Sequence, residues 1–254
     1  MLTLHLDFVD ISFVIPALDE EKYIVKTLEA IKAQKTKLKY EIIVVDGKSK
    51  DNTVKLAKKY GRVIIQKTRG ISNARNLGAK AAKGEFLVFI DADTVIEQDY
   101  VSRVIGYLKK HPKVAGVTAR LNYDFSKFFW KIIWWFAERY ILIRSYFGKG
   151  RLTGINIAMR RDTFKKFKGF QEVPSEDVAF TAALWKFGQT KYLTSTVTHS
   201  SARRFNKEPW GIIKYYFVRD ILTFTRTHKS RKFKNIEKKI EKKLAKEAKY
   251  KKIR

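Results

Sequence analysis

Cysteine is missing from the 254-residue sequence. Its absence excludes disulfide bonds and thiolate metal sites, and it is typical of proteins in a reducing cell interior. Together with abundant lysine and little glutamine, it also indicates a heat-adapted source.

Acidic residues are few compared with basic ones. The chain has 25 Asp and Glu against 54 Lys and Arg, and its formal net charge is +29. A charge of this size indicates an anionic partner: nucleic acid, an anionic membrane surface or a phosphorylated substrate. Hydrophobic residues make up 45% of the chain, which excludes global disorder and supports a sizeable core.

Long apolar runs are absent as well. No stretch of about 18 uncharged apolar residues occurs, so no helix clearly spans a bilayer, and residues 1–10 lack the charged start of a signal peptide. The nearest candidate, residues 128–147, carries four charged side chains. We therefore expect a cytoplasmic protein.

The first half of the chain alternates apolar strand-like runs with segments of helical periodicity. This β-α-β-α-β-α-β order predicts an α/β fold with a Rossmann-like, mostly parallel sheet and helices on both faces. The second half adds strands, a helix and two segments dense in aromatic residues. The expected strands cover residues 11–15, 40–45, 62–66, 86–90, 114–122, 151–160 and 192–198, and the expected helices cover 20–34, 53–60, 71–83 and 178–187. The aromatic segments cover 125–147 and 210–227, and a basic helix is expected over 229–254.

Two carboxylates, Asp91 and Asp93, directly follow the apolar run of residues 86–90. Residues two apart on a strand share a face, and ligands of open α/β sheets bind at the carboxyl ends of the strands. Two acids at this point predict a divalent cation, Mn²⁺ or Mg²⁺, with a phosphate as its second partner. The alternative is that Asp93 and Thr94 cap a following helix, which explains Asp93 but not Asp91.

Further polar residues follow other predicted strands. Glu20 and Asp46 are suited to accept hydrogen bonds from a nucleobase, although Glu20 also fits a simple helix start. Neither a G-x-G-x-x-G nor a P-loop pattern occurs, so the metal and arginine must hold any phosphates. The pair Arg203 and Arg204 suits bidentate phosphate contacts.

Asp177 is a candidate general base, with the alternative that Glu176 and Asp177 only favour a helix start. Residues 153–156 place a glycine, and with it the backbone, close to a ligand. His199, just after a strand, is a candidate third metal ligand, against the alternative of a structural histidine.

Together these motifs resemble the inverting family 2 glycosyltransferases of the GT-A fold. The resemblance covers roughly residues 10 to 205. It depends on the number of matching motifs and on their order along the chain. The matching segments are 14–20, 43–47, 51–53, 70–78, 84–93, 154–156, 176–177 and 201–205.

The resemblance implies sugar transfer from a nucleotide-diphosphate sugar with inversion at the anomeric carbon. It implies that Asp91 contacts ribose or metal, that Asp93 binds Mn²⁺ or Mg²⁺, and that Asp177, beside Glu176, takes the acceptor proton. The residues that it implies for nucleotide-sugar binding are Pro16, Leu18, Glu20, Asp46, Arg75, Asp91, Asn156, Arg203 and Arg204. The chain departs from the family at Asp19, where Asn is common, and at Gly47, where a second acid is common, so the base is not identified.

On this basis, residues 1–205 are expected to form the catalytic domain, with a nucleotide-sugar-binding half (10–120) and an acceptor half (121–205). Residues 206–254 are expected to form a basic helical extension. The aromatic segments and the basic tail predict peripheral association with the inner face of the cell membrane and a lipid-linked acceptor, such as a polyprenyl phosphate, or a glycan. A core helix and a solvated tail are the alternative.

Two other functions stay open. One is a basic nucleic-acid-binding protein, although no recognition motif occurs. The other is a nucleotidyltransferase, although residues 16–21 do not form a Gly-rich basic loop. The donor sugar, the acceptor and the oligomeric state are not specified by the sequence.

Overall fold

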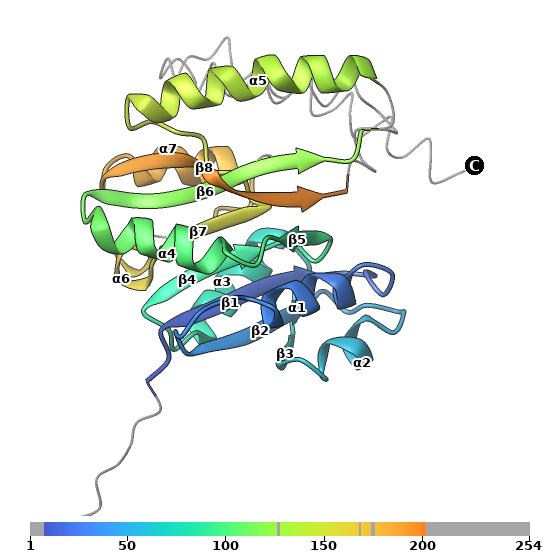
Figure 1. Ribbon diagram of the computed structural model, residues 1–254. Coiled ribbons are helices and arrows are strands. Elements are labelled where there is room, and N and C mark those ends of the chain that lie inside the picture. Colours follow the sequence, from blue (N-terminus) through green and yellow to red (C-terminus); the bar gives the residue numbers. More distant parts are fainter. Residues whose placement is uncertain (1–7, 126–127, 168, 174–175, 202–254) are drawn as a thin grey trace, which may run out of the picture.

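The computed structural model describes residues 8–201 apart from 126–127, 168 and 174–175. Over these ranges the chain forms one eight-stranded sheet with helices on both faces (Figure 1), which confirms the expected fold class. The strands are β1 (Ile11–Ala17), β2 (Tyr40–Asp46), β3 (Arg62–Ile65), β4 (Phe86–Ile90), β5 (Thr94–Ile96), β6 (Val114–Tyr123), β7 (Asn156–Arg160) and β8 (Gln189–Ser200). The helices are α1 (Ile24–Lys32), α2 (Thr53–Ala57), α3 (Ile71–Ala81), α4 (Tyr100–Lys110), α5 (Phe128–Tyr146), α6 (Arg161–Lys165) and α7 (Glu176–Leu184).

The strand order in the sheet is β3-β2-β1-β4-β7-β6-β8-β5. Strands β3, β2, β1 and β4 are parallel, as are β6 and β8. Strand β7 runs antiparallel to β4 and β6, and β5 runs antiparallel to β8. Because β7 runs in the opposite direction, its first residue, Asn156, pairs with Ile90 at the carboxyl end of β4. The loop before β7 therefore reaches the edge where ligands of such sheets bind.

A three-residue link connects two strands, β4 and β5, that are far apart in the strand order of the sheet. Strand β5 follows β4 after only Asp91, Ala92 and Asp93, yet it pairs with β8 at the other end of the sheet. Since a link of this length spans only about 10 Å, the sheet must curl until the edge formed by β8 and β5 approaches the carboxyl end of β4. Thr94 begins β5, so Asp93 and Thr94 do not cap a helix.

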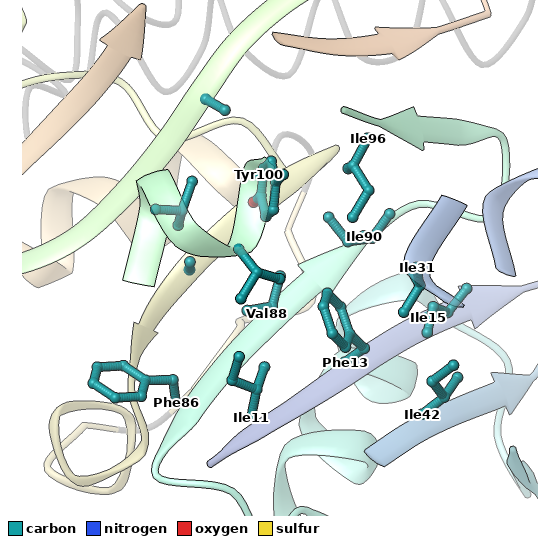
Figure 2. Close-up of a cluster of buried hydrophobic side chains, with 14 of the residues drawn as sticks. Ile11, Phe13, Ile15, Ile31, Ile42, Phe86, Val88, Ile90, Ile96 and Tyr100 are labelled. Atoms are coloured by element: carbon teal, nitrogen blue, oxygen red, sulfur yellow. The ribbon is translucent and has the colours of Figure 1, made fainter. Parts of the chain in front are cut away.

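Alternation along β1 explains why both faces of the sheet are covered. Ile11, Phe13 and Ile15 pack on one face against α1 and α4, whereas Val14 packs on the other face with residues of α3 and α7. Figure 2 shows the first of these clusters, in which side chains of β1, β2 and β4 converge with those of α1 and α4.

Helix α5 lies on the side of the molecule away from β3 and α2 (Figure 1). It corresponds to the aromatic segment expected at residues 125–147. In the part of the chain that the structure describes, no helix combines the length and apolar content that crossing a bilayer requires. The other aromatic segment and the basic tail lie outside the described residues.

Several expected elements differ from the observed ones. The helix expected from residue 20 begins at Ile24, after a turn in which the Tyr23 N–H donates to the Glu20 carbonyl at 3.0 Å. The strand expected over 151–160 begins only at Asn156. Strand β5 and helix α4 have no counterpart among the expected elements.

Candidate functional site

The loops after β1 and β2 are fastened to each other by hydrogen bonds in both directions. The Asp19 N–H donates to Ser49 Oγ at 2.9 Å, and the Lys50 N–H donates to Asp19 Oδ1 at 2.7 Å. The Glu20 N–H donates to Thr53 Oγ1 at 2.8 Å. These bonds fix the path of the chain at the carboxyl ends of both strands.

The residues predicted to hold a nucleoside meet at this edge. Pro16 and Glu20 are partly exposed, and Leu18 is exposed. Asp46 is fully buried, and its two oxygens accept hydrogen bonds from the N–H and the hydroxyl of Ser49, at 2.9 and 2.5 Å. In this structure Asp46 organises the loop after β2, and its carboxylate does not reach the surface.

Gln66, which the sequence did not single out, lies beside these residues. It is buried just after β3, and a Cβ added to Gly47 would lie 3.1 Å from its Nε2. Its Oε1 is buried without a hydrogen-bond partner among the described residues. Gln66 therefore borders the space that a side chain at position 47 would enter, and only the pairing of β2 with β3 brings the two positions together.

Arg75 of α3 lies at the centre of the site and is 1% exposed. Its Nη2 donates to Asp91 Oδ1 and to the Gly154 carbonyl, both at 2.9 Å, and its Nη1 donates to Glu176 Oε1 at 2.6 Å. The guanidinium carbon lies 5.2 Å from the ring centroid of Phe170. One side chain thus joins α3 to the link after β4, the loop before β7 and the start of α7.

The acidic partners of Arg75 stabilise its positive charge. Burial alone would lower the pKa of Arg75, but the negative charges of Asp91 and Glu176 outweigh burial and raise the pKa above its usual value. The sequence predicted Arg75 as a nucleotide-sugar contact. Both of its Nη groups donate to protein acceptors here, so Arg75 also connects the two acids Asp91 and Glu176.

Asp91 and Asp93 lie in the link between β4 and β5 and not within a strand. Ala92 between them is buried, whereas both acids are partly exposed. The Asp91 N–H donates to the Ile155 carbonyl at 3.1 Å. Two such carboxylates fit Mg²⁺ or Mn²⁺, because proteins bind these ions through one or two carboxylates together with substrate phosphates.

The sequence predicted His199 as a third metal ligand. His199 pairs with Val95 across β8 and β5, and its Nε2 lies 3.0 Å from Glu97 Oε1. Within the described ranges, no three His, Asp or Glu side chains form a group that could hold a metal ion. The expected set of Asp91, Asp93 and His199 is therefore not assembled.

Glu176 and Asp177 open α7, where the positive end of the helix dipole favours negative charge. Asp177 Oδ2 accepts the Gly154 N–H at 3.3 Å and lies 3.9 Å from Arg151 Nη2. Asp177 Oδ1 also accepts the Val178 N–H at 2.9 Å, so Glu176 pairs with the Arg75 guanidinium whereas the hydrogen bonds to Asp177 come from backbone N–H groups.

Asn156, a predicted nucleotide-sugar contact, is completely buried. Its Oδ1 accepts the Ala119 N–H at 2.6 Å, and its Nδ2 donates to Thr198 Oγ1 at 3.0 Å. Its amide therefore ties β7 to β6 and β8. Arg203 and Arg204 lie outside the described residues.

Comparison with known proteins gives a family and several relatives. The model of the family described as Glycosyl transferase family 2 matches residues 12–168. The chain is 36% identical over 125 residues to Dolichyl N-acetyl-alpha-D-glucosaminyl phosphate 3-beta-D-2,3-diacetamido-2,3-dideoxy-beta-D-glucuronosyltransferase of Methanococcus voltae, over 44% of this chain and 39% of that protein. It is 35% identical over 114 residues to Poly-beta-1,6-N-acetyl-D-glucosamine synthase of Staphylococcus aureus (strain COL), over 42% of this chain and 27% of that protein. The similarity thus spans less than half the length of these relatives.

Solved structures share the GT-A fold. The mannosyltransferase PcManGT from Pyrobaculum calidifontis, in complex with GDP-Man and Mn²⁺, superposes with a TM-score of 0.69 at 18% identity over 92% of this chain and 69% of that chain. Residues 1–349 of S. aureus TarS, in complex with UDP-GlcNAc, superpose with a TM-score of 0.64 at 21% identity over 76% and 58% of the two chains.

Proposed function

Because the chain belongs to glycosyl transferase family 2 and is a glycosyltransferase, we propose that it transfers a sugar, with inversion, from a nucleotide-diphosphate sugar bound with a divalent cation. The proposed acceptor is a polyprenyl phosphate or another lipid-linked or glycan acceptor at a membrane surface. Family membership removes the two alternatives that the sequence left open, nucleic-acid binding without glycosyl transfer and nucleotidyl transfer.

The observation that carries this proposal is the pair of contacts made by Arg75. It holds Asp91, next to the proposed diphosphate, and Glu176, next to the proposed base, on one guanidinium. Transfer between two bound substrates depends on such fixed geometry, since aligning the reacting groups removes much of the entropic barrier.

On the donor side, Pro16, Leu18 and Glu20 contact the nucleoside. Asp46 supports these residues indirectly, through its hydrogen bonds to Ser49 in the loop after β2. Asp91 and Asp93 would hold Mn²⁺ or Mg²⁺, which as a Lewis acid would neutralise charge on the departing diphosphate. PcManGT, named as a complex with GDP-Man and Mn²⁺, supports this choice of cation. Arg203 and Arg204 are proposed to contact the diphosphate from the segment after β8.

On the acceptor side, an acceptor oxygen attacks the anomeric carbon while the bond from that carbon to the diphosphate breaks. If the acceptor is a hydroxyl, its proton passes to Asp177, and the nucleoside diphosphate leaves. Asp177 suits this role because Glu176 is already committed to Arg75. Glu176 is therefore proposed as a positioning residue.

A phosphate acceptor changes this requirement. A phosphate is already ionised near neutral pH and needs no base, and the Methanococcus relative is named for a dolichyl phosphate-linked sugar. Asp93→Asn should reduce transfer by about 100-fold or more with either acceptor. Asp177→Asn should do the same with a hydroxyl acceptor but retain most activity with a phosphate acceptor. Initial rates with polyprenyl phosphate and with a glycan distinguish the cases, and wild-type rates in Asp93→Asn would contradict the proposed metal site.

The donor is tested by thermal unfolding with UDP-GlcNAc or GDP-mannose, with and without Mn²⁺. A donor at about 100 times its Kd should stabilise the protein by about 2.7 kcal/mol. The stabilisation should require Mn²⁺ and should be lost in Asp93→Asn. If neither these nor other nucleotide sugars raise the unfolding temperature, the proposed function is wrong.

A further inference from the structure

Helix α5 presents its apolar side to solvent. Seven large hydrophobic residues of the helix are between 41% and 82% exposed, and Phe147 just after it is 73% exposed. The seven are Phe128, Phe129, Ile132, Trp135, Phe136, Ile143 and Tyr146. A contiguous patch of this kind on a folded domain marks an interaction surface.

The spacing of these residues places most of them on one side of the helix. Positions 128, 132, 135, 139, 143 and 146 follow each other at helical intervals of three and four, and position 136 lies four residues after 132 and three before 139. We call these positions, together with Phe129 and Phe147, the outer face of α5. The only charged residue at these positions is Arg139, which lies 5.3 Å from the Trp135 ring centroid.

The buried side of the helix carries polar groups that bond to the sheet. Glu138 is 2% exposed and accepts two hydrogen bonds from Arg120, at 2.8 and 3.0 Å, and one from the Tyr192 hydroxyl at 3.0 Å. Ser145 bonds to the Tyr192 backbone N–H at 2.8 Å. A buried carboxylate without partners is strongly unfavourable. Rotating α5 to hide its aromatic side would break these bonds, so the outward orientation is built into the packing.

The exposed charged residues of α5 have one sign. Lys131 and Arg139 are exposed, whereas the only acid of α5, Glu138, is buried. The face is thus apolar, rich in aromatic residues and flanked by cations, in a chain whose formal net charge is +29. This combination complements the interface of an anionic bilayer, where aromatic rings sit at headgroup depth and cations pair with lipid headgroups.

We propose that α5 lies in the plane of an anionic membrane surface and docks the enzyme on it through the outer face. The proposal rests on the proposed function in one respect only, namely that the acceptor is bound to a membrane. Docking through α5 would hold the catalytic domain beside acceptors that are confined to the bilayer. The helix lies along the membrane and does not cross it.

Sedimentation of the full-length chain with vesicles tests the proposal. Phosphatidylcholine vesicles with and without phosphatidylglycerol are the probes. The variant Phe128→Ser/Trp135→Ser/Phe136→Ser/Ile143→Ser should lose about tenfold or more of the partitioning. The control is Phe8→Ser/Phe187→Ser, which removes exposed aromatic residues away from α5 and should partition like wild type. Equal binding of both variants would overturn the proposal and assign binding to another surface.

The other possible occupants of the face are residues 202–254 and a second copy of the chain. Because the chain has no cysteine, Phe136→Cys and Phe187→Cys can each carry one environment-sensitive fluorophore. We expect a blue shift on vesicle addition only at position 136. A label at 136 that is already shielded without vesicles, or a dimer that the serine variant converts to a monomer, would overturn the proposal.

The failure of docking and the failure of the proposed function are separable. Donor-dependent thermal stabilisation is measured on the same serine variant, and it should match wild type because α5 contributes no residue to the donor site. Vesicle binding without any response to nucleotide sugars would leave docking intact and refute the function. Stabilisation by a nucleotide sugar without vesicle binding would support the proposed function and refute docking through α5.

Discussion

Arg75 determines the geometry of the candidate site through contacts that local sequence does not reveal. Its partners Asp91, Gly154 and Glu176 come from three other segments and converge only in the folded sheet. Gly154 permits this approach, because an added Cβ would lie 2.6 Å from Arg75 Nη2.

Gly154→Ala should therefore displace the guanidinium from Asp91. We expect about a 10- to 100-fold loss of transfer, because small misplacements of positioned groups are costly, and destabilisation by about 1–3 kcal/mol. Transfer rates and chemical denaturation measure the two effects.

The matched control is Gly106→Ala in α4, where an added Cβ meets no atom within 4 Å. It should raise the free energy of unfolding by about 0.5–1 kcal/mol and leave transfer unchanged. Equal behaviour of the two variants would show that crowding of Arg75 has no role.

Tyr100 gives a prediction about pH. Its side chain is completely buried, its hydroxyl has no hydrogen-bond partner among the described residues, and burial raises its pKa above the usual value. Tyr100→Phe should raise the free energy of unfolding by about 1 kcal/mol at neutral pH, since it removes an unpaired buried group.

The advantage of Tyr100→Phe should grow above pH 10. There the unfolded tyrosine ionises while the buried one stays neutral, so the wild type loses stability as pH rises, by at most about 1.4 kcal/mol per pH unit for this group. Denaturation at pH 8 and pH 10.5 measures the difference. A constant difference between variant and wild type would contradict the raised pKa.

At the scale of elements, the alternating strands and helices of the first half were predictable because β1, β2 and β4 are buried almost throughout and read as apolar runs. The boundaries were less predictable. Helix α1 begins only after the turn at residues 21–23, and strand β5 is too short to produce a pattern. The orientation of α5 could not be predicted, because aromatic residues lie on every side of it and the partners of Glu138 come from β6 and β8.

Glu138 should be required for the attachment of α5. Glu138→Ala removes the carboxylate to which Arg120 and the buried Tyr192 hydroxyl donate, and we expect destabilisation by about 2–4 kcal/mol. Hydrogen exchange should also quicken along α5 before the rest of the protein.

The matched control is Glu29→Ala on α1, which removes an exposed acid that accepts a bond from Tyr60 at 3.3 Å. Its effect should stay within about 0.5 kcal/mol. If Glu138→Ala is equally mild, α5 is held by its apolar contacts alone.

For the whole molecule, the convergence of the motifs at one sheet edge followed from the parallel topology. The contacts within the site did not, since Asp46 and Asn156 proved to be buried and bonded to the protein, and Gln66 carries no motif. The prediction of a separate tail over 206–254 remains a proposal.

The large positive charge should weaken the fold at low ionic strength. Raising salt from about 0.05 to 0.5 M shortens the Debye length several-fold and screens the mutual repulsion of like charges. We expect the unfolding temperature to rise over this range, as measured by calorimetry in the absence of ligands. A falling unfolding temperature would mean that exposed ion pairs such as Arg103 with Asp99 outweigh the repulsion.

The short link between β4 and β5 has a mechanical consequence. Strand β4 lies near the middle of the strand order and β5 at its end. The three-residue link that contains Asp91 and Asp93 therefore holds β5 close to β4 and keeps the sheet curled. These acids cannot shift far unless β5 separates from β8. Inserting residues into this link would let Asp91 and Asp93 move independently of β5. The same insertion in the turn between α4 and β6 would leave the positions of the two acids unchanged.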